Sequence, residues 1–351
     1  MANSNLPSEK TPKKGSAQED SRVTNKARKG VTPSSAGEKS HSPSKLVIKF
    51  WGVRGSYPVP GPKTVKYGGN TSCVEVRNDN HRIIFDSGTG IIGLGDQIMT
   101  EYRAHDGNAS SPLVFSILLS HTHYDHIHAL PFFQPAYLSQ ASMHVFGPKL
   151  LGYDLRESIS ETMTARYCPV RLEEMNSHKV IVNIADTDHL LFRNSHKVPR
   201  VITAHDEMAE LHHDDLLVSV MHSYAHPKDG VFVYKVQNNG QSVVYATDTE
   251  GYRGGDSRLI KFAQNADVLI HDSQYTTAEY TDVQDPKQGF GHSTVDMACE
   301  VAEKANVKQL VLFHHDPRHN DDMMKRVEEH ARRLFKNVIA AYEGLEIYLG
   351  E

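Results

Sequence analysis

The chain has 351 residues, with 38 Lys and Arg against 43 Asp and Glu and a formal net charge of −5. No run approaches the roughly 20 apolar residues that cross a membrane, and the first residues lack the apolar segment of a secretory signal, so we expect a cytoplasmic protein. Its three cysteines, Cys73, Cys168 and Cys299, have no CxxC spacing, which disfavours a disulfide framework and a thiolate zinc site. Histidine is unusually frequent: 22 residues against 12 Phe and 15 Tyr indicate that the chain uses imidazole.

Residues 1–44 differ in composition from the rest. Their only large aliphatic residues are Leu6, Val23 and Val31, and they carry eight Lys or Arg against four acids. A segment this polar buries too little apolar surface to offset its ordering entropy, so we expect a disordered basic tail. The remaining residues, 45–351, carry a net charge of −9 and are predicted to form one folded domain. An acidic domain disfavours polyanion binding as its main role.

From Lys45 onward, short apolar runs and helical periodicities follow one another. The predicted strands are Leu46–Trp51, Ser72–Val76, Arg82–Asp86, Leu113–Ser120, Leu216–His222, Gly230–Val236, Ser242–Thr247, Val268–Asp272 and Gln309–His314. The predicted helices are Ile91–Tyr102, Leu155–Arg166, Ser257–Ala266, Ser293–Ala305 and Asp321–Phe335. Several strands come first, and strands then alternate with helices. This order predicts an α/β fold with a sheet-rich core flanked by helices.

A cluster of histidines follows the apolar run that ends at Leu119. His121, His123, Asp125 and His126 lie within six positions, where a strand is predicted to end. Strand ends are where sheet proteins place chemistry, because the rigid strand aims the side chains. In a loop, the first two imidazoles can face one metal ion, while Asp125 and His126 face a second. Imidazole and carboxylate without thiolate suit Zn²⁺ first, with Mn²⁺ and Fe²⁺ as alternatives.

Two metal ions need more ligands, and three further strand ends offer them. His222 and His226 follow one predicted strand, Asp248 follows another, and His314 and His315 follow a third. Asp248 could bridge both ions, with one imidazole completing each side. Two clamped ions would activate a water and stabilise charge on the attacking and leaving oxygens.

These motifs resemble the metallo-β-lactamase superfamily, in its tRNase Z-like branch, over almost everything after residue 45. The HxHxDH signature stands at His121–His126 and is followed by Leu130–Phe133. The other matching segments are Phe50–Ser56, Gly68–Cys73, Phe85–Gly90, Asp267–Asp272 and Gly291–Thr294. The resemblance implies an αββα sandwich with a dinuclear metal site at one sheet edge. It also implies that Asp86 supports a ligand histidine from behind.

The resemblance assigns the ligands residue by residue. It gives one metal to His121, His123 and His226, the other to Asp125, His126 and His314, and a bridging role to Asp248. The family's ligand immediately precedes a proline, which favours His226 over His222. The family's last ligand ends a strand, which favours His314 over His315. Both choices stay open in the sequence.

His292 and Asp272 form a second feature near the expected metals. His292 directly precedes the predicted helix that starts at Ser293, and a helix N-terminus favours anions such as phosphate. Paired with Asp272, this histidine would donate to a phosphoryl oxygen or a leaving group. The plainer alternative is a structural histidine that ties a loop to a helix. We therefore predict Asp125, His292 and Asp272 as the catalytic residues.

Among the phosphodiester substrates that the resemblance implies, we expect a small cyclic nucleotide or cyclic phosphate, hydrolysed by a metal-dependent phosphodiesterase through a metal-bound hydroxide. A tRNA 3′-end processing endoribonuclease is the alternative, but the Leu150–Leu217 segment contains acidic pairs rather than a basic glycine- and proline-rich arm. A di-metal redox enzyme is disfavoured because the family's di-iron members have Glu where this chain has His123. A thioester or lactam hydrolase also remains open. The expected partner is a small phosphodiester, with tRNA not excluded, no membrane, and a homodimer as an open alternative.

Overall fold

The computed structural model describes residues 45–104 and 113–350, so the predicted tail lies outside the described residues. One sheet has the strand order β15-β1-β2-β3-β4-β5-β6. Its strands are β1 (Leu46–Gly52), β2 (Cys73–Arg77), β3 (Arg82–Phe85), β4 (Leu113–Leu118), β5 (Ala141–Pro148), β6 (His178–Ile184) and β15 (Glu346–Leu349). Pairing is antiparallel from β15 to β3 and parallel from β3 to β6.

The second sheet has the order β14-β13-β12-β11-β10-β9-β7-β8. Its strands are β7 (His189–Arg193), β8 (His196–Ile202), β9 (Leu216–Ser223), β10 (Val231–Asn238), β11 (Gln241–Ala246), β12 (Val268–Asp272), β13 (Gln309–Phe313) and β14 (Val338–Ala340). The strands from β11 to β14 are parallel, and the others pair antiparallel. The carboxyl ends of β11, β12 and β13 therefore lie at one edge of this sheet.

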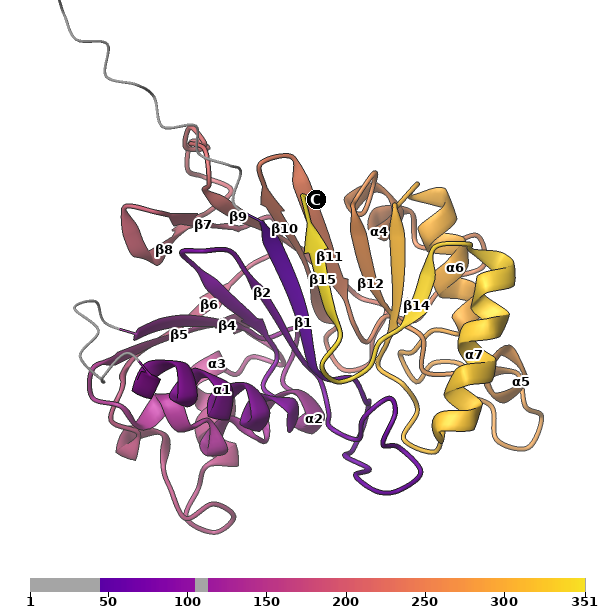
Figure 1. Cartoon of the computed structure of the whole chain (residues 1–351), viewed down its shortest axis with the longest axis horizontal. Coiled ribbons are helices and arrows are strands. Elements are labelled where there is room, and N and C mark those ends of the chain that lie inside the picture. Colours follow the sequence, from indigo (N-terminus) through magenta and orange to yellow (C-terminus); the bar gives the residue numbers. More distant parts are fainter. Residues whose placement is uncertain (1–44, 105–112, 351) are drawn as a thin grey trace, which may run out of the picture. The chain divides into compact units, whose positions relative to one another are not determined.

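Helices cover the outer face of each sheet (Figure 1). The first sheet carries α1 (Gly90–Ala104), α2 (Tyr124–Ile127) and α3 (Leu155–Thr162), with short 3₁₀ turns at Leu130–Phe132, Gln134–Tyr137 and Leu172–Glu174. The second carries α4 (Ser257–Phe262), α5 (Thr277–Tyr280), α6 (Val295–Lys304) and α7 (Asp321–Leu334). Separate apolar clusters lie between each sheet and its helices, and a third lies between the sheets. The expected αββα sandwich is confirmed.

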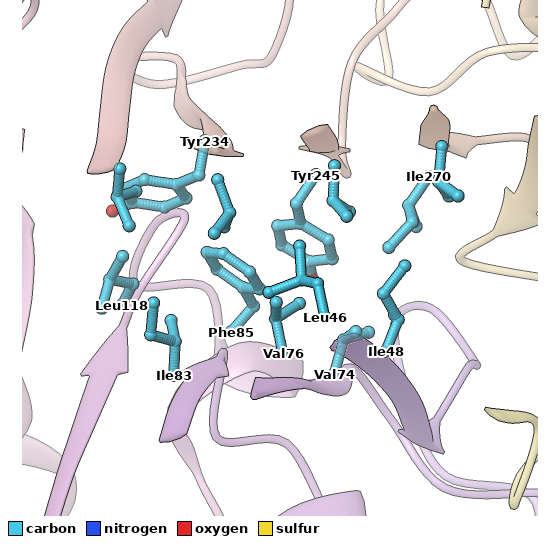
Figure 2. Close-up of a cluster of buried hydrophobic side chains, with 14 of the residues drawn as sticks. Leu46, Ile48, Val74, Val76, Ile83, Phe85, Leu118, Tyr234, Tyr245 and Ile270 are labelled. Carbon is cyan, nitrogen blue, oxygen red and sulfur yellow. The ribbon is translucent and has the colours of Figure 1, made fainter. Parts of the chain in front are cut away.

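An apolar layer fills the space between the two sheets, next to the predicted site. Figure 2 shows side chains of the first sheet facing those of the second: Val74, Ile83, Phe85 and Leu118 opposite Tyr234, Tyr245 and Ile270. The ring of Phe85 stacks on that of Tyr245, with centroids 4.9 Å apart and planes 15° apart. Because all these side chains are fully or almost fully buried, the two sheets are held in a fixed relation next to the site.

The predicted elements all occur, with small shifts at their ends. The first sheet's β4 ends at Leu118, α3 ends at Thr162, and α6 begins at Val295 because the Thr294 hydroxyl accepts the Met297 N–H and caps the helix. Strands β5, β6, β7, β8, β14 and β15 were not expected from the sequence. Within residues 45–104 and 113–350, no helix has the length and apolar content needed to cross a membrane.

Candidate metal centre

The structure brings all seven predicted ligands together where strands of both sheets end. His121, His123 and His226 form what we call the outer group, and Asp125, His126 and His314 form the inner group. Potential ligand atoms of the outer group and Asp248 all lie within 4.8 Å of one another, as do those of the inner group. Six of the seven side chains are buried, and His123 is the more exposed exception.

Asp248 lies between the two groups. Its Oδ1 is 3.3 Å from His126 Nε2 and 3.2 Å from His314 Nε2. Its Oδ2 faces the outer group, 3.7 Å from His121 Nε2 and 3.8 Å from His226 Nε2. Burial opposes ionisation of Asp248, but the imidazoles around it prevail and keep its pKa well below the usual range. One carboxylate oxygen is thus offered to each group, as a bridging ligand requires.

In four of the five ligand histidines, one ring nitrogen contacts a supporting protein atom and the other points at the metal centre. Four rings use Nδ1 for a protein partner: His121 with Ser120 Oγ at 3.0 Å, His126 with Asp86 Oδ2 at 2.8 Å, His226 with Gly291 O at 2.9 Å and His314 with Gln274 Oε1 at 2.9 Å. This fixes each ring with Nε2 directed at the centre. His123 turns its Nδ1 inward instead, 3.0 Å from His226 Nε2.

The hydrogen bonding and the pKa values of these histidines indicate whether the site suits metal cations. The buried Nε2 of His121 makes no hydrogen bond, and leaving a buried polar atom unpaired is costly. Burial lowers the pKa of His121 well below its usual value, and burial together with neighbouring histidines lowers that of His123 to about 4. Neutral imidazoles that converge with carboxylates are the donor set of divalent metal sites. The residues present therefore fit a dinuclear metal centre.

Asp86 holds the inner group in place from behind. Besides facing His126 Nδ1, its carboxylate accepts the Ser120 N–H at 2.8 Å and the Tyr245 hydroxyl at 2.7 Å. Asp86 and His314 have φ of +61° and +58°, a left-handed conformation that is strained for these residues and is kept only where the surroundings enforce it. The position of Asp86 agrees with the supporting role that the resemblance implies.

The loop after β1 closes over the inner group. The Ser56 N–H donates to Asp125 Oδ2 at 2.8 Å. At Gly55, an added Cβ would lie 2.3 Å from the His314 ring, so only glycine allows this approach. The buried guanidinium of Arg54 fixes the loop by donating to three main-chain carbonyls. This explains why the Phe50–Ser56 motif accompanies the ligands.

The structure places the competing histidines away from the carboxylates. His222 Nε2 is 2.7 Å from the Asp229 carbonyl. His315 is buried, and its Nε2 lies 2.9 Å from the Ala341 carbonyl. His226 and His314, by contrast, have ligand atoms close to those of the other potential metal ligands.

His292 and Asp272 are paired beside the inner group. His292 Nδ1 is 2.8 Å from Asp272 Oδ2, and its ring stacks on that of His314, with centroids 4.9 Å apart. Burial opposes its protonation, but Asp272 raises the pKa of His292 to about 9. His292 also lies close enough to Asp248 and His314 to form a third potential metal-binding group with them. The pair can thus act as a proton donor or complete a metal's coordination.

Several supporting residues were missed by sequence reasoning. Ser120, Gln274 and the Gly291 carbonyl orient ligand rings; Ser120 precedes the HxHxDH motif and Gly291 begins the Gly291–Thr294 motif, but neither was assigned this role. Glu250 supports the outer group indirectly: its carboxylate accepts N–H groups of Gly289 at 2.7 Å and Gly291 at 2.9 Å, and the Tyr280 hydroxyl at 2.6 Å. Nothing in the sequence links these positions, because the links form only when distant loops meet.

A four-layer αββα fold with histidine and aspartate ligands at the strand ends defines a metallo-hydrolase. The beta-lactamase superfamily domain model matches residues 81–315. The chain belongs to the metallo-β-lactamase superfamily and is a metal-dependent hydrolase with a His/Asp metal-binding cluster.

The named relatives extend over most of the chain. Ribonuclease Z of Picrophilus torridus is 27% identical and aligns over 86% of this chain and 96% of its own length. Ribonuclease Z of Thermoplasma acidophilum is 25% identical with the same coverage. Among solved structures, human tRNase Z, short form, has a TM-score of 0.54 at 20% identity, covering 87% of this chain and 100% of its own. The Bacillus subtilis protein YhfI has a TM-score of 0.56 at 16% identity, covering 87% and 99%. Distant homologues therefore place the chain near the tRNase Z branch.

Proposed function

We propose that this chain is a zinc-dependent phosphodiesterase that cleaves the 3′ end of precursor RNA. The observation that carries the proposal is the complete donor set, with its adjacent His–Asp pair, in a chain that aligns with ribonuclease Z over nearly the full length of those relatives. This reverses the order of substrates that the sequence favoured, where a small cyclic phosphate came first. Zn²⁺ suits a site of five imidazoles and two carboxylates, and Mn²⁺ is the alternative.

In this proposal, His121, His123 and His226 hold one ion, Asp125, His126 and His314 hold the other, and Asp248 serves both. When bound, two such ions supply an activated water and neutralise charge on the attacking and leaving oxygens of a phosphodiester. The chain's own residues then set orientation: Asp248 offers one oxygen to each side, and the Ser56 N–H fixes Asp125. Gly55 and Gln274 keep the His314 ring in place.

His292 is proposed as the proton donor to the leaving oxygen. Its Nδ1 is engaged by Asp272, which leaves Nε2 for substrate, and the Asp272 carboxylate favours the protonated ring by raising the pKa of His292. Asp272 is itself fixed by the N–H groups of Ser293 at 2.9 Å and Gln274 at 3.2 Å. A ribose alkoxide is a poor leaving group, so a positioned acid accelerates its departure.

A small cyclic phosphate remains the second candidate because of how the segment between β5 and β9 folds. Part of this segment forms β6 in the first sheet and β7 and β8 in the second. The rest includes the acidic pairs Glu173–Glu174 and Asp214–Asp215. Among the described residues, this segment supplies sheet strands rather than a basic arm that would grip a large RNA.

The test is a substrate panel with metal-replete protein. We expect two zinc equivalents and cleavage of a precursor tRNA that carries a 3′ trailer, with lower activity on 2′,3′- and 3′,5′-cyclic nucleotides. Bis(p-nitrophenyl) phosphate reports on phosphodiester chemistry independently of the substrate's shape. Turnover of cyclic nucleotides alone would establish the second candidate. Bound iron without turnover of any phosphodiester would contradict the proposal and favour redox chemistry.

A further inference from the structure

Two pockets adjoin the metal centre, and each is lined by exposed tyrosines. The first, of about 580 Å³, lies beside His226 and is lined by Tyr224, Tyr252 and Arg253 from the loops after β9 and β11. Tyr224 is 69% exposed and Tyr252 is 53% exposed. Such volumes fall within the roughly 300–1,000 Å³ of small-molecule sites.

The second pocket, of about 470 Å³, adjoins the HxHxDH loop. It is lined by Tyr124, Tyr153 and Tyr167, together with Thr122 and residues of α3. These three tyrosines are 65%, 51% and 74% exposed. Exposed aromatic rings gathered at a pocket mark a binding surface more often than a scaffold, because scaffold rings are normally covered.

One ring in each pocket is held by a neighbouring imidazole. Tyr224 packs on His222, with ring centroids 4.2 Å apart. Tyr124 stacks on His128, with centroids 5.1 Å apart and planes 12° apart. Each contact positions a tyrosine that stays largely exposed to a ligand, tilted against its imidazole at Tyr224 and stacked on it at Tyr124. A planar base is the ligand that such a surface accepts, since every base has a π-face.

Each pocket includes a tyrosine that lies close in the chain to a predicted metal ligand. Tyr124 directly follows His123, Tyr224 comes two residues before His226, and those two histidines approach to 3.0 Å. Arg253 adds a positive charge to the first pocket, and within the described part of the chain it has no carboxylate at ion-pair distance. The guanidinium is therefore available for a phosphate.

We propose that the two pockets bind unpaired nucleosides on opposite sides of the cleaved phosphate, so that the substrate is an extended single strand. This inference rests on the proposed phosphodiesterase function and specifies its substrate class. Tyr224 and Tyr252 stack with one base, Tyr153 and Tyr167 stack with the other, and Arg253 binds the adjoining phosphate. A cyclic mononucleotide carries one base and would fill only one of the pockets.

The experiment couples protein variants to substrate variants. The substrate is a precursor tRNA with a 3′ trailer, in which the nucleotide on each side of the cleaved bond is either a uridine or an abasic spacer, with one side changed at a time. Loss of one stacked base corresponds to roughly 5- to 150-fold in KM. We expect Tyr224→Ala or Tyr252→Ala to raise KM by this factor. In these variants, replacing the uridine by an abasic spacer on one side of the bond should no longer change KM. Tyr153→Ala or Tyr167→Ala is expected to do the same for the other spacer.

Matched variants separate stacking from other causes. Tyr224→Phe and Tyr167→Phe keep the ring and are expected to keep KM within about twofold. Tyr348→Ala, on strand β15 and in neither pocket, is expected to change nothing, and zinc content verifies that every variant retains the centre. If the precursor is cleaved but the tyrosine and base substitutions change KM independently of each other, with additive free energies, this inference would be overturned. The proposed function would then still hold. Wild-type protein that hydrolyses cyclic mononucleotides but not the precursor would overturn both the RNA substrate and this inference.

Discussion

The two ligand groups of the centre are held by different kinds of support. The inner group is buried and is held by two side chains and one main-chain N–H: Asp86 faces His126, Gln274 faces His314, and the Ser56 N–H reaches Asp125. The outer group lies closer to solvent and includes the partly exposed His123. His121 faces the Ser120 hydroxyl, but the support of His226 is less direct, since it is oriented by a main-chain carbonyl on a loop that Glu250 fixes.

This difference suggests that the two metal positions have different roles. Buried carboxylate support raises the basicity of a ligand imidazole and limits its motion, which favours tight metal retention. A main-chain carbonyl carries less negative charge than a carboxylate, and its position changes when its loop moves. It therefore holds the imidazole less firmly. We therefore expect the inner position to retain its ion more strongly, while the outer position, next to both tyrosine pockets, adapts to substrate.

The largest effect is expected from the removal of Asp248, which lies between the two groups. Asp248→Ala is expected to abolish phosphodiester turnover and to lose at least one zinc equivalent, because neither side keeps its bridging oxygen. Metal analysis and turnover of bis(p-nitrophenyl) phosphate measure both effects, and circular dichroism verifies the fold. Retention of two equivalents in this variant would refute the bridge.

The next effect separates chemistry from metal binding. His292→Ala is expected to keep both zinc equivalents and to lose about 10²- to 10⁴-fold in kcat on a ribose leaving group. The loss should shrink with p-nitrophenolate, which departs without protonation. His330→Ala, a surface histidine on α7, is the control. If the His292 variant loses zinc, the residue is a ligand. Equal losses on both substrates would instead point to a positioning role.

A smaller effect tests the support of the inner group. Asp86→Asn keeps the side chain's shape, and Asn tolerates the positive φ at this position. It removes the charge behind His126, so we expect a roughly 10- to 100-fold loss in affinity for the more tightly held zinc. Competition with a chromogenic chelator measures this affinity. Weakening of the other, looser zinc alone would reverse our assignment of the two positions.

The smallest effect concerns the outer group. Glu250→Gln weakens the hold on Gly289 and Gly291 and thus only indirectly disturbs His226. We expect about a tenfold loss in affinity for the weaker zinc and no change in the stronger one. Glu300→Gln, which breaks only a surface pair with Lys304, is the matched control. A loss as large as that of the Asp86 variant would remove the distinction between the groups.

The sequence reveals what is local or periodic in this molecule. His121 to His126 are neighbours in the chain, and Asp248 and His314 end apolar strands, so their meeting at a sheet edge could be predicted. Strand β8 was missed because Pro199 interrupts its pattern, and the strand indeed lies at the edge of its sheet, where a missing donor is tolerated. The contacts of the Gly291 carbonyl and of Gln274 could not be predicted, since their partners lie 65 and 40 residues away.

The hydroxyl of Tyr245 connects the centre to the contact between the sheets. Tyr245 belongs to β11 of the second sheet, whereas Asp86 follows β3 of the first, and the Tyr245 ring stacks on Phe85. A fluctuation that parts the sheets at this point removes the Tyr245 hydroxyl from Asp86 and thus loosens the support of His126. The exchange rate of the inner ion would then depend on how often the two sheets separate locally. Exchange of radiolabelled zinc and amide hydrogen exchange at β3 and β11 would therefore report the same opening event.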